Sequence, residues 1–392
     1  MNARHENAQY DIAIIGGGPV GAALALALRD SRLSICVLEA RPADAASSDA
    51  RALALSYGSR LLLERLGVWD AIQDVSPIRT IHVSQKQSLG RTLLHAAEMD
   101  VPDLGYVLPY PALHRALDHA MRHSTIRTIY GASVSGLNNR SGAAAEIGYQ
   151  QDGAEHALSA RLVAVADGGR LLAEKFPPEV HDYGQTALIA HVTCSDPRAA
   201  TAFERFTAQG PLALLPFKEG YELVWTAPHQ RAQEMLAWDD ARFLDELHRH
   251  FGDRVGEFLG AGTRTCFPLG LRRAPSQTPM PHTVLIGNAS QTMHPVAGQG
   301  FNMGLRDAWE LAQVILDTAP DRLGDVGMLA AYRERRSSDR ESGIRFTDGL
   351  VRLFSNDLLA LGTCRAAALS ALDCLPLAKK FVARRMMFGA NG

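Results

Sequence analysis

The chain has 392 residues, of which 46% are hydrophobic and 21% are charged, and its formal net charge is -2. This composition is typical of a globular protein with one large or two interleaved domains, and the nearly neutral charge argues against a nucleic-acid-binding surface. No apolar run is long enough to predict a transmembrane helix, and the N-terminus lacks the pattern of a secretory signal. The five cysteines are scattered without a C-x-x-C pair, which predicts a cytoplasmic protein with neither a metal site nor a disulfide framework.

The N-terminal region reads as a strand, a glycine-rich turn, a helix and a second strand. Residues 10–15 form a β-branched run that predicts a buried parallel strand, and they lead directly into the turn GGGPVG at 16–21. A helix rich in Ala and Leu is expected over residues 20–28. The next strand, over residues 33–38, ends on Glu39. This order is typical of a dinucleotide-binding βαβ unit.

Each glycine of this turn has a mechanical role. Gly16 permits the tight turn, Gly18 lets a pyrophosphate approach the backbone, and Gly21 lets helix and strand pack closely. The N-terminus of the helix offers free N–H groups to the phosphates. Glu39 is placed to accept hydrogen bonds from ribose hydroxyls, and its charge would repel a 2′-phosphate. The unit therefore predicts NAD or the ADP half of FAD, and not NADP.

Two polar features between the glycine turns fit the same ligand. Arg51 follows the Glu39 strand, where a cation could reach the pyrophosphate, although it could also be a solvated arginine. Asp167 and Gly168 follow the apolar run 162–166, which suits an acidic residue and a turn beside a ribose. Taken singly, that dipeptide is only a turn signal.

A second strand, glycine loop and helix occur about 260 residues further on. The apolar run 283–289 ends in a turn and leads to the loop 294–302 and a helix over 305–312. A dehydrogenase would not need this second loop, whereas a dinucleotide that carries an isoalloxazine ring would. The loop N–H groups and the helix dipole would stabilise negative charge at the flavin N1/O2 edge. The residues that we assign to the cofactor here are Gly287, Asn288, Gly298, Gln299, Gly300 and Asn302.

Several segments together carry a resemblance to a known family: 16–21, 49–55, 202–207 with 210–213, 287–302, and 338–340 to 354–356. Over residues 10 to 356 the chain resembles the FAD-dependent aromatic hydroxylases of the p-hydroxybenzoate hydroxylase fold. It is most similar to the ubiquinone-biosynthesis branch, and within it to the hydroxylases of 2-polyprenyl-6-methoxyphenol. The 294–302 motif is specific to that branch, while the nucleotide fingerprint is not.

The chain departs from the wider family at two positions. Asn288 stands where the family has an aspartate that bonds the ribityl chain, and its amide can still hydrogen-bond. The Asp167–Gly168 motif continues as 169–172 without the usual Ser and downstream Arg, which argues against a transient NADPH bound at that motif.

The resemblance implies an α/β fold with a Rossmann-like FAD-binding domain, an interleaved substrate domain built on a mixed β-sheet, and C-terminal helices. By alternation, residues 81–84 and 220–225 read as strands of the mixed sheet. The segments that we expect are 8–75, 106–180 and 275–335 for the FAD-binding domain, 76–105 and 181–274 for the substrate domain, and 336–392 for the helical region.

The implied chemistry is a monooxygenase reaction in ubiquinone biosynthesis. NAD(P)H or another donor transiently reduces FAD, O2 forms a flavin C4a-hydroperoxide, and its distal oxygen hydroxylates a polyprenylated phenol to the 1,4-benzoquinol. The protein must orient the ring and exclude water.

His294, followed by Pro295, is the best titratable candidate near the flavin, although it could equally be a loop histidine that bonds the backbone. Candidates for the substrate pocket, each of which could simply pack in the core, are His82, Phe203, Phe206, Leu214, Pro216, Tyr221 and Trp225.

The C-terminal segment, from Leu350 onward, has two possible interpretations. From Leu350 onward apolar residues recur at helical spacing, and Lys379, Lys380, Arg384 and Arg385 lie near the end. This pattern is typical of a basic amphipathic helix on an anionic membrane surface, which would make the protein peripheral on the inner face of the membrane. The same residues could instead pack on the FAD-binding domain or on a partner, such as another ubiquinone-biosynthesis protein.

Two alternative functions remain. One is a hydroxylase of another ring position or another aromatic substrate; a flavin halogenase is disfavoured because no tryptophan lies in a W-x-W-x-I-P motif. The other is a non-catalytic FAD-binding scaffold of the ubiquinone-biosynthesis complex.

Overall fold

Strand β1 (Ala8–Ile15) forms the centre of a seven-stranded sheet. Its residues from Ile12 to Ile14 are all apolar and fully buried, as expected of a strand covered on both faces. It pairs in parallel with β2 (Ile35–Glu39) and with β11 (Ala154–Val165). The remaining strands of the sheet are β8 (Arg127–Tyr130), β9 (Ser133–Asn138), β10 (Ala145–Gln151) and β18 (Thr283–Leu285).

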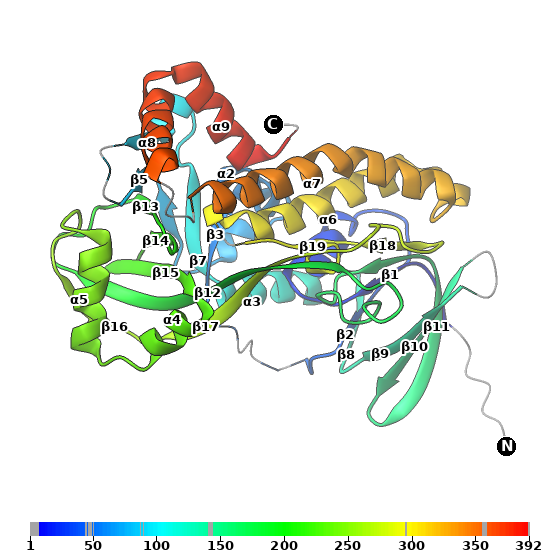
Figure 1. The fold of residues 1–392 in the computed structure, drawn as a ribbon. Coiled ribbons are helices and arrows are strands. Elements are labelled where there is room, and N and C mark those ends of the chain that lie inside the picture. Colours follow the sequence, from blue (N-terminus) through cyan, green and yellow to red (C-terminus); the bar gives the residue numbers. More distant parts are fainter. Residues whose placement is uncertain are drawn as a thin grey trace.

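This computed structural model describes residues 8–43, 45, 49, 51–86, 88, 90–139, 144–294, 296–354 and 359–390. Helices cover one face of the seven-stranded sheet and share a large apolar core with it. They are α1 (Pro19–Ala27), α3 (Tyr110–Arg122), α6 (Gln299–Asp317) and the start of α7 (Val326–Phe354). Figure 1 shows α6 and α7 lying side by side above the strands.

A second sheet of nine strands adjoins the first. It is mixed because β13 (Thr201–Thr207) pairs in parallel with β5 (Thr80–Gln85), whereas its other pairs are antiparallel. Helices α4 (His229–Leu236) and α5 (Asp240–Phe251) pack with one of its faces. The other strands are β6 (Arg91–His95), β12 (Glu179–Cys194), β14 (Gly210–Phe217), β15 (Gly220–Pro228), β16 (Phe258–Ala261), β17 (Thr265–Arg273) and β19 (Gln291–Thr292).

A small three-stranded sheet lies between these parts, and two helices end the chain. The sheet contains β3 (Ala52–Ser56), β4 (Ser76–Ile78) and β7 (Gly105–Pro109), and α2 (Tyr57–Arg65) follows β3. Helices α8 (Leu359–Cys374) and α9 (Pro376–Phe388) stand at one end of the molecule beside β5 (Figure 1). No helix in the described part of the chain is long and apolar enough to cross a membrane.

The α/β class and the strands expected over 10–15, 81–84 and 220–225 are confirmed. The nine-stranded sheet draws mainly on 76–105 and 181–274, the segments expected to form the substrate domain. Strand β19 comes from the segment assigned to the FAD-binding domain and pairs with β17, so the two parts are joined by backbone hydrogen bonds.

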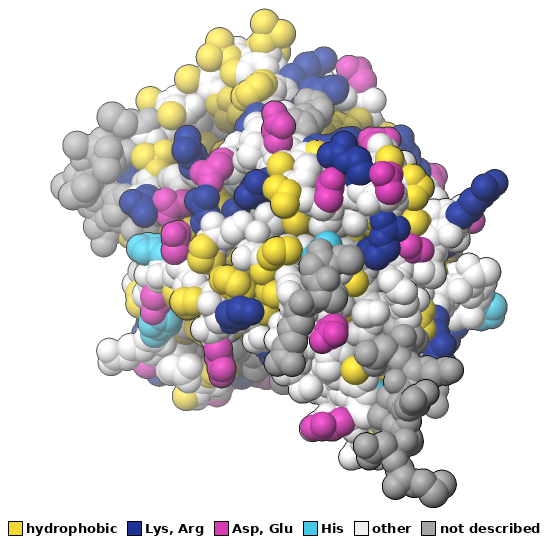
Figure 2. Space-filling model, turned by 90° about the vertical axis from the view of Figure 1, so that its right-hand side faces the viewer, with side chains coloured by type: hydrophobic (Ala, Val, Ile, Leu, Met, Phe, Trp, Pro, Cys, Tyr) yellow, Lys and Arg dark blue, Asp and Glu magenta, His cyan; other side chains and the backbone are white. Residues whose placement is uncertain are grey.

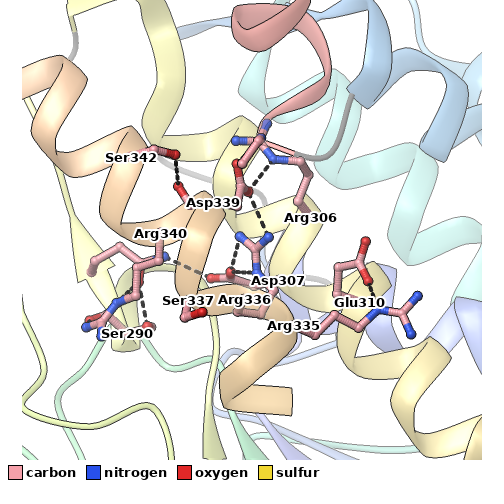
Figure 3. A network of polar contacts seen from close by, with 12 residues as sticks. Ser290, Arg306, Asp307, Glu310, Arg335, Arg336, Ser337, Asp339, Arg340 and Ser342 are labelled. Carbon is pink, nitrogen blue, oxygen red and sulfur yellow. Dashed lines mark hydrogen bonds and ion pairs between the residues drawn. The ribbon is translucent and has the colours of Figure 1, made fainter. Parts of the chain in front are cut away.

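A buried cluster of charges fastens α6 to α7, and we call Arg306, Asp307, Arg336 and Asp339 the α6–α7 charge cluster (Figure 3). Arg336, with a side chain only 1% exposed, donates to Asp307 at 2.8 Å and to Asp339 at 2.7 Å. Burial alone would raise the pKa of Asp339, but Arg306 and Arg336 lower it to about 2. Asp307 also accepts the N–H of Gly287 at 3.1 Å, so the cluster holds the turn that precedes the second glycine loop.

Candidate active site

The first glycine turn adopts the geometry that its residue types predict. Gly16 has a φ of +103°, which favours glycine, and a Cβ atom on Gly21 would lie 2.0 Å from the Gly16 carbonyl oxygen. A Cβ on Gly18, by contrast, would meet no heavy atom within 4 Å. Gly18 is the N-cap of α1, and its lack of a side chain means that the first N–H groups of this helix, which begin after Pro19, receive no side-chain cap. Such a helix end is an anion-binding site.

Glu39 is held beside this turn by hydrogen bonds to both carboxylate oxygens. Its Oε2 accepts the N–H of Gly17 at 2.6 Å, and its Oε1 accepts the backbone N–H and the Nε of Arg41, each at 2.9 Å. Burial alone would raise the pKa of Glu39, but these hydrogen bonds lower it, so the carboxylate is ionised. A cavity of about 380 Å³ adjoins Glu39 and is also lined by Arg41, His114 and Tyr130. Its position suits the adenosine half of a dinucleotide, and sequence reasoning named only Glu39 among its walls.

Arg51 and Asp167 already have protein partners. Arg51 forms an ion pair with Asp49 at 2.5 Å and lies over the ring of Phe267. The Asp167 carboxylate accepts backbone N–H groups of the turn that follows, including that of Leu171 at 2.7 Å. Gly168, with a φ of +80°, leaves open space where a Cβ would lie. The cofactor roles of Arg51, Asp167 and Gly168 stay predictions.

The second glycine loop ends at another uncapped helix N-terminus. Gly298 is the N-cap of α6, has a φ of +61° and provides no side-chain cap. A Cβ on Gly300 would meet nothing within 4 Å, so space is open beside the first turn. Gln299 donates from its amide to the Met386 carbonyl at 3.2 Å, which ties this helix end to α9.

Asn302 is engaged by the protein at both ends of its amide. Its Oδ1 accepts the N–H of Ser56 at 2.8 Å and the hydroxyl of Ser59 at 2.7 Å. Its Nδ2 donates to the carbonyls of Ala54 at 3.0 Å and Gly298 at 2.6 Å. The side chain therefore positions the loop against β3 and α2, and it has little capacity left for a ligand.

The two uncapped helix ends lie close together because small residues separate them. A Cβ on Gly287, whose φ is +59°, would lie 3.2 Å from the methyl groups of Val20 at the start of α1. A Cβ on Gly304 in α6 would lie 2.9 Å from Val20. Asn288 follows in this turn and is exposed. Two neighbouring helix N-termini with open space beside them fit one extended ligand that carries negative charge at its pyrophosphate and at a reduced flavin, as FAD does.

His294 is fully buried and presents an unused donor. Its Nδ1 accepts the N–H of Val296 at 3.1 Å, so the ring hydrogen lies on Nε2, which has no partner among the described residues. Burial lowers the pKa of His294 to about 4, so the ring is neutral near physiological pH. It can donate a hydrogen bond to a ligand, but it is poorly suited to be a base. Pro295, the other residue predicted to act there, lies outside the described residues.

A second cavity, of about 300 Å³, is bordered by the α6 N-terminus, the nine-stranded sheet and the C-terminal helices. His294, Gly298, Gln299 and Asn302 border it on the loop side. The apolar residues of its wall include Ile81, Val83, Phe206, Ala213, Leu215, Val224, Val296, Phe346, Leu350, Leu369, Leu372, Val382, Met386 and Met387. We call this the apolar cavity.

The structure corrects which strand face lines the apolar cavity. Phe206 lines it, and Phe203 borders it, although the Phe203 ring packs against Phe251 in the core on the other side of the sheet. Other pocket candidates from the sequence do not line it: His82, Leu214, Pro216, Tyr221 and Trp225. Leu214, Tyr221 and Trp225 lie in the core under α5 instead. Both faces of these strands are buried, so alternation alone could not tell them apart.

Glu204, which sequence reasoning did not select, also lines the apolar cavity. It lies on β13 and has no hydrogen bond or ion pair with any described residue. Burial raises the pKa of its carboxyl from 4.5 to about 7. The sequence held only a weak signal for it, because Glu204 is the one acid of β13 and stands beside Arg205 between Phe203 and Phe206.

Comparisons with known proteins identify the family of the chain. The model of the FAD binding domain family matches residues 9–347. The chain is 33% identical to the ubiquinone hydroxylase UbiL of Rhodospirillum rubrum, over 96% of this chain and 89% of that one. It is 32% identical to the 3-demethoxyubiquinol 3-hydroxylase of Escherichia coli, over 94% and 95%.

A solved structure, the p-nitrophenol 4-monooxygenase PnpA of Pseudomonas putida, has the same fold. It superposes with a TM-score of 0.79 at 15% identity and covers 98% of this chain and 99% of its own. The family match runs through both glycine turns, and the two relatives span nearly the whole chain. The protein therefore belongs to the FAD-dependent aromatic hydroxylases, in their ubiquinone-biosynthesis branch.

Proposed function

We propose that this protein hydroxylates the ring of 2-polyprenyl-6-methoxyphenol to the 1,4-benzoquinol. The observation that carries the proposal is the apolar cavity, because about 300 Å³ beside the α6 N-terminus suits an aromatic ring and the start of an apolar tail. Two relatives at more than 30% identity are named as ubiquinone-pathway hydroxylases, which supports a substrate of this class.

Bound FAD, reduced by NAD(P)H or another donor, would supply the activation of O2. The chain's own residues hold and shield this chemistry. The N–H groups at the start of α1 and α6 would bind the pyrophosphate and the flavin N1/O2 edge. The apolar wall excludes water, and the Nε2–H of His294 would donate to a flavin or substrate oxygen.

Deleting the gene and identifying the accumulating quinone precursor by mass spectrometry tests this function. We expect 2-polyprenyl-6-methoxyphenol to build up and the wild-type gene to clear it. Build-up of a precursor that already carries that oxygen would instead assign another ring position. An unchanged quinone profile would contradict the proposal.

We also infer that the α9 end of the molecule rests on a membrane surface. Figure 2 shows hydrophobic side chains gathered at the top of the molecule, the end formed by α8 and α9 in Figure 1. On α9, Leu377 is 84% and Phe381 is 64% exposed, while Val382 and Met386 on the same helix line the apolar cavity. A lipid-soluble tail could therefore pass from the bilayer to the cavity along this helix.

The basic residues contribute less to this surface than the sequence indicated. Lys379 is only 7% exposed, pairs with Glu98 at 2.9 Å and donates to the Leu93 carbonyl, so it helps to fasten α9 to the fold. Lys380 and Arg384 remain exposed. The expected packing of the C-terminal helices on the rest of the chain is thus also present, through residues such as Ala383 and Met387.

Replacing Leu377 and Phe381 together by Ser tests the membrane contact without disturbing the buried face of α9. We expect the fraction bound to anionic liposomes in a sedimentation assay to fall at least severalfold, because exposed apolar area drives insertion. Leu259→Ser, at a residue 61% exposed on β16, is the matched control and should bind as the wild type does. Equal binding by the double variant would contradict the inference.

A further inference from the structure

The apolar cavity contains a single acid. Among the described residues that line it, Glu204 is the only carboxylate, and His294 is the only other titratable group. Strands β5 and β14 and helices α7, α8 and α9 contribute only uncharged side chains to the lining. No cation among the described residues therefore lines the cavity opposite Glu204.

The neighbouring cation along the strand points away from it. Arg205 follows Glu204 on β13, and its Nε donates to the His250 carbonyl at 2.9 Å, on the side of the sheet covered by α5. Side chains alternate along a strand, so Arg205 and Glu204 lie on opposite faces. The Glu204 side chain is partly exposed, and it lines the apolar cavity without a partner among the described residues. An unpaired carboxylate in apolar surroundings is unfavourable, so its presence in this cavity points to a functional role.

The place of Glu204 on the sheet puts it near the second glycine loop. Its direct neighbours across the strands are Val83 and Ala213, which both line the apolar cavity. Phe206, two residues along the same face, packs in one cluster with Val296, which follows His294 and Pro295 in the loop. A ring bound between the loop and the sheet would therefore lie within the space that Glu204 faces.

Resting on the proposed function, we propose that Glu204 is the catalytic base that takes the proton of the substrate's phenolic hydroxyl. The phenolic O–H bond breaks, a new O–H bond forms on the carboxylate, and the electron pair stays on the phenolic oxygen. The ring becomes richer in electrons at the carbon that receives oxygen. When that carbon later loses its hydrogen as a proton, Glu204 returns its own proton to the phenolic oxygen. No further oxidant or reductant is needed.

The protonation chemistry of the two titratable groups agrees with this assignment. Burial raises the pKa of Glu204 to about 7, so it is a stronger base than an ordinary carboxylate and is still ionised in part at neutral pH. His294 is a poor alternative, because its Nδ1 already accepts the Val296 N–H and its Nε2 carries the hydrogen.

The test compares two variants of the FAD-loaded protein that separate hydrogen bonding from proton transfer. Glu204→Gln can still accept a hydrogen bond but cannot take a proton, whereas Glu204→Leu can do neither. The probes are 2-prenyl-6-methoxyphenol with a short prenyl chain and its methyl ether, which has no phenolic proton. Binding is followed by the change in flavin absorbance, and hydroxylation by product formation over a range of pH.

We expect the wild type to bind the phenol about tenfold or more tightly than the ether at pH 8, through a hydrogen bond to a charged acceptor. Glu204→Leu should lose this preference. Glu204→Gln should keep much of it, but its hydroxylation should be about a hundredfold slower and should lack the rise in rate near pH 7. Glu222→Gln, on the neighbouring β15 where Glu222 pairs with His191, is the matched control and should behave as the wild type does.

The outcomes separate the two proposals. The wild type can bind and hydroxylate the phenol while Glu204→Leu still prefers the phenol to the ether and Glu204→Gln keeps the wild-type rate and its pH dependence. This result overturns the role of Glu204 and leaves the proposed function standing. A wild type that binds neither compound overturns the proposed function, and the role of Glu204 falls with it.

Discussion

The α6–α7 charge cluster and the apolar cavity shift the pKa of their carboxyl groups in opposite directions. In the cluster, Asp307 and Asp339 each receive hydrogen bonds from Arg336, and the pKa of Asp339 is lowered to about 2. In the cavity, Glu204 has no partner among the described residues, and burial raises its pKa to about 7. The same chemical group is thus fixed as an anion in one region and can exchange a proton in the other.

This difference in hydrogen-bond partners distinguishes residues that stabilise the fold from residues that are available to bind a ligand. Around the cluster the polar groups bind one another, and Asn302 beside the second loop is likewise engaged by protein at both ends of its amide. Around the cofactor and substrate space, the starts of α1 and α6 and the Nε2 of His294 lack such partners in the described part of the chain. Unsatisfied polar groups gathered in one place are expected at a binding site.

The largest effect should come from breaking the cluster. Arg336→Met leaves Asp307 and Asp339 buried without their shared cation, and we expect the free energy of unfolding to fall by about 3–5 kcal/mol. Urea denaturation of the FAD-loaded protein measures this. Arg335→Met is the control, because Arg335 is 42% exposed, pairs with Glu310 and should contribute less than about 1 kcal/mol. Equal losses of unfolding free energy in the two variants would contradict the stabilising role of the buried cluster.

A substitution of Glu204 in the apolar cavity should instead raise the free energy of unfolding. The pKa of Glu204 is raised in the folded state, so the protonated form is fully favourable below pH 4.5, and that advantage is lost as the pH rises through about 7. Glu204→Gln should therefore match the wild type near pH 4 and be more stable by about 2–3 kcal/mol above pH 8. Thermal unfolding across this pH range checks the prediction. A variant less stable than the wild type at pH 8 would mean that Glu204 has a partner.

A smaller effect, on ligand binding alone, is expected at Gly18. A Cβ there meets no protein atom within 4 Å, so Gly18→Ala should fold normally but place a methyl group where we predict that the pyrophosphate approaches. We expect the Kd for FAD to rise at least about tenfold, measured by flavin fluorescence on reconstitution. Gly21→Ala provides the contrast, because its Cβ would lie 2.0 Å from a backbone oxygen and should destabilise the fold itself. Unaltered FAD affinity in Gly18→Ala would contradict the assigned pyrophosphate site.

Much of the cofactor side could be predicted because backbone geometry demands particular residues there. The tight turn at Gly16 and the close packing at Gly21 allow few alternatives, and Glu39 ends its strand where the pattern places it. The substrate side could not be predicted in the same way. Strands β14 and β15 are buried on both faces, so the residue types alone do not reveal that Leu214 and Trp225 pack under α5 and not at the cavity.

Ion pairs that the residue types alone do not reveal bear on two further predictions. Lys379 looked like part of a basic surface, but Glu98 lies 281 positions earlier and holds it against the fold. Arg51 pairs with Asp49, only two positions earlier, and its contact with the pyrophosphate stays a prediction. Glu204 is the converse case, because an acid in a strand becomes informative only once the structure shows that no described residue pairs with it.

Single-turnover hydroxylation tests the central claim most directly. The FAD-loaded protein, reduced chemically without air so that the natural donor is not needed, is mixed with 2-polyprenyl-6-methoxyphenol and isotopically labelled O2, and the products are analysed by mass spectrometry. We predict the 1,4-benzoquinol with one labelled oxygen atom in its ring hydroxyl. Reoxidation of the flavin with only hydrogen peroxide and unchanged phenol as products would contradict the account.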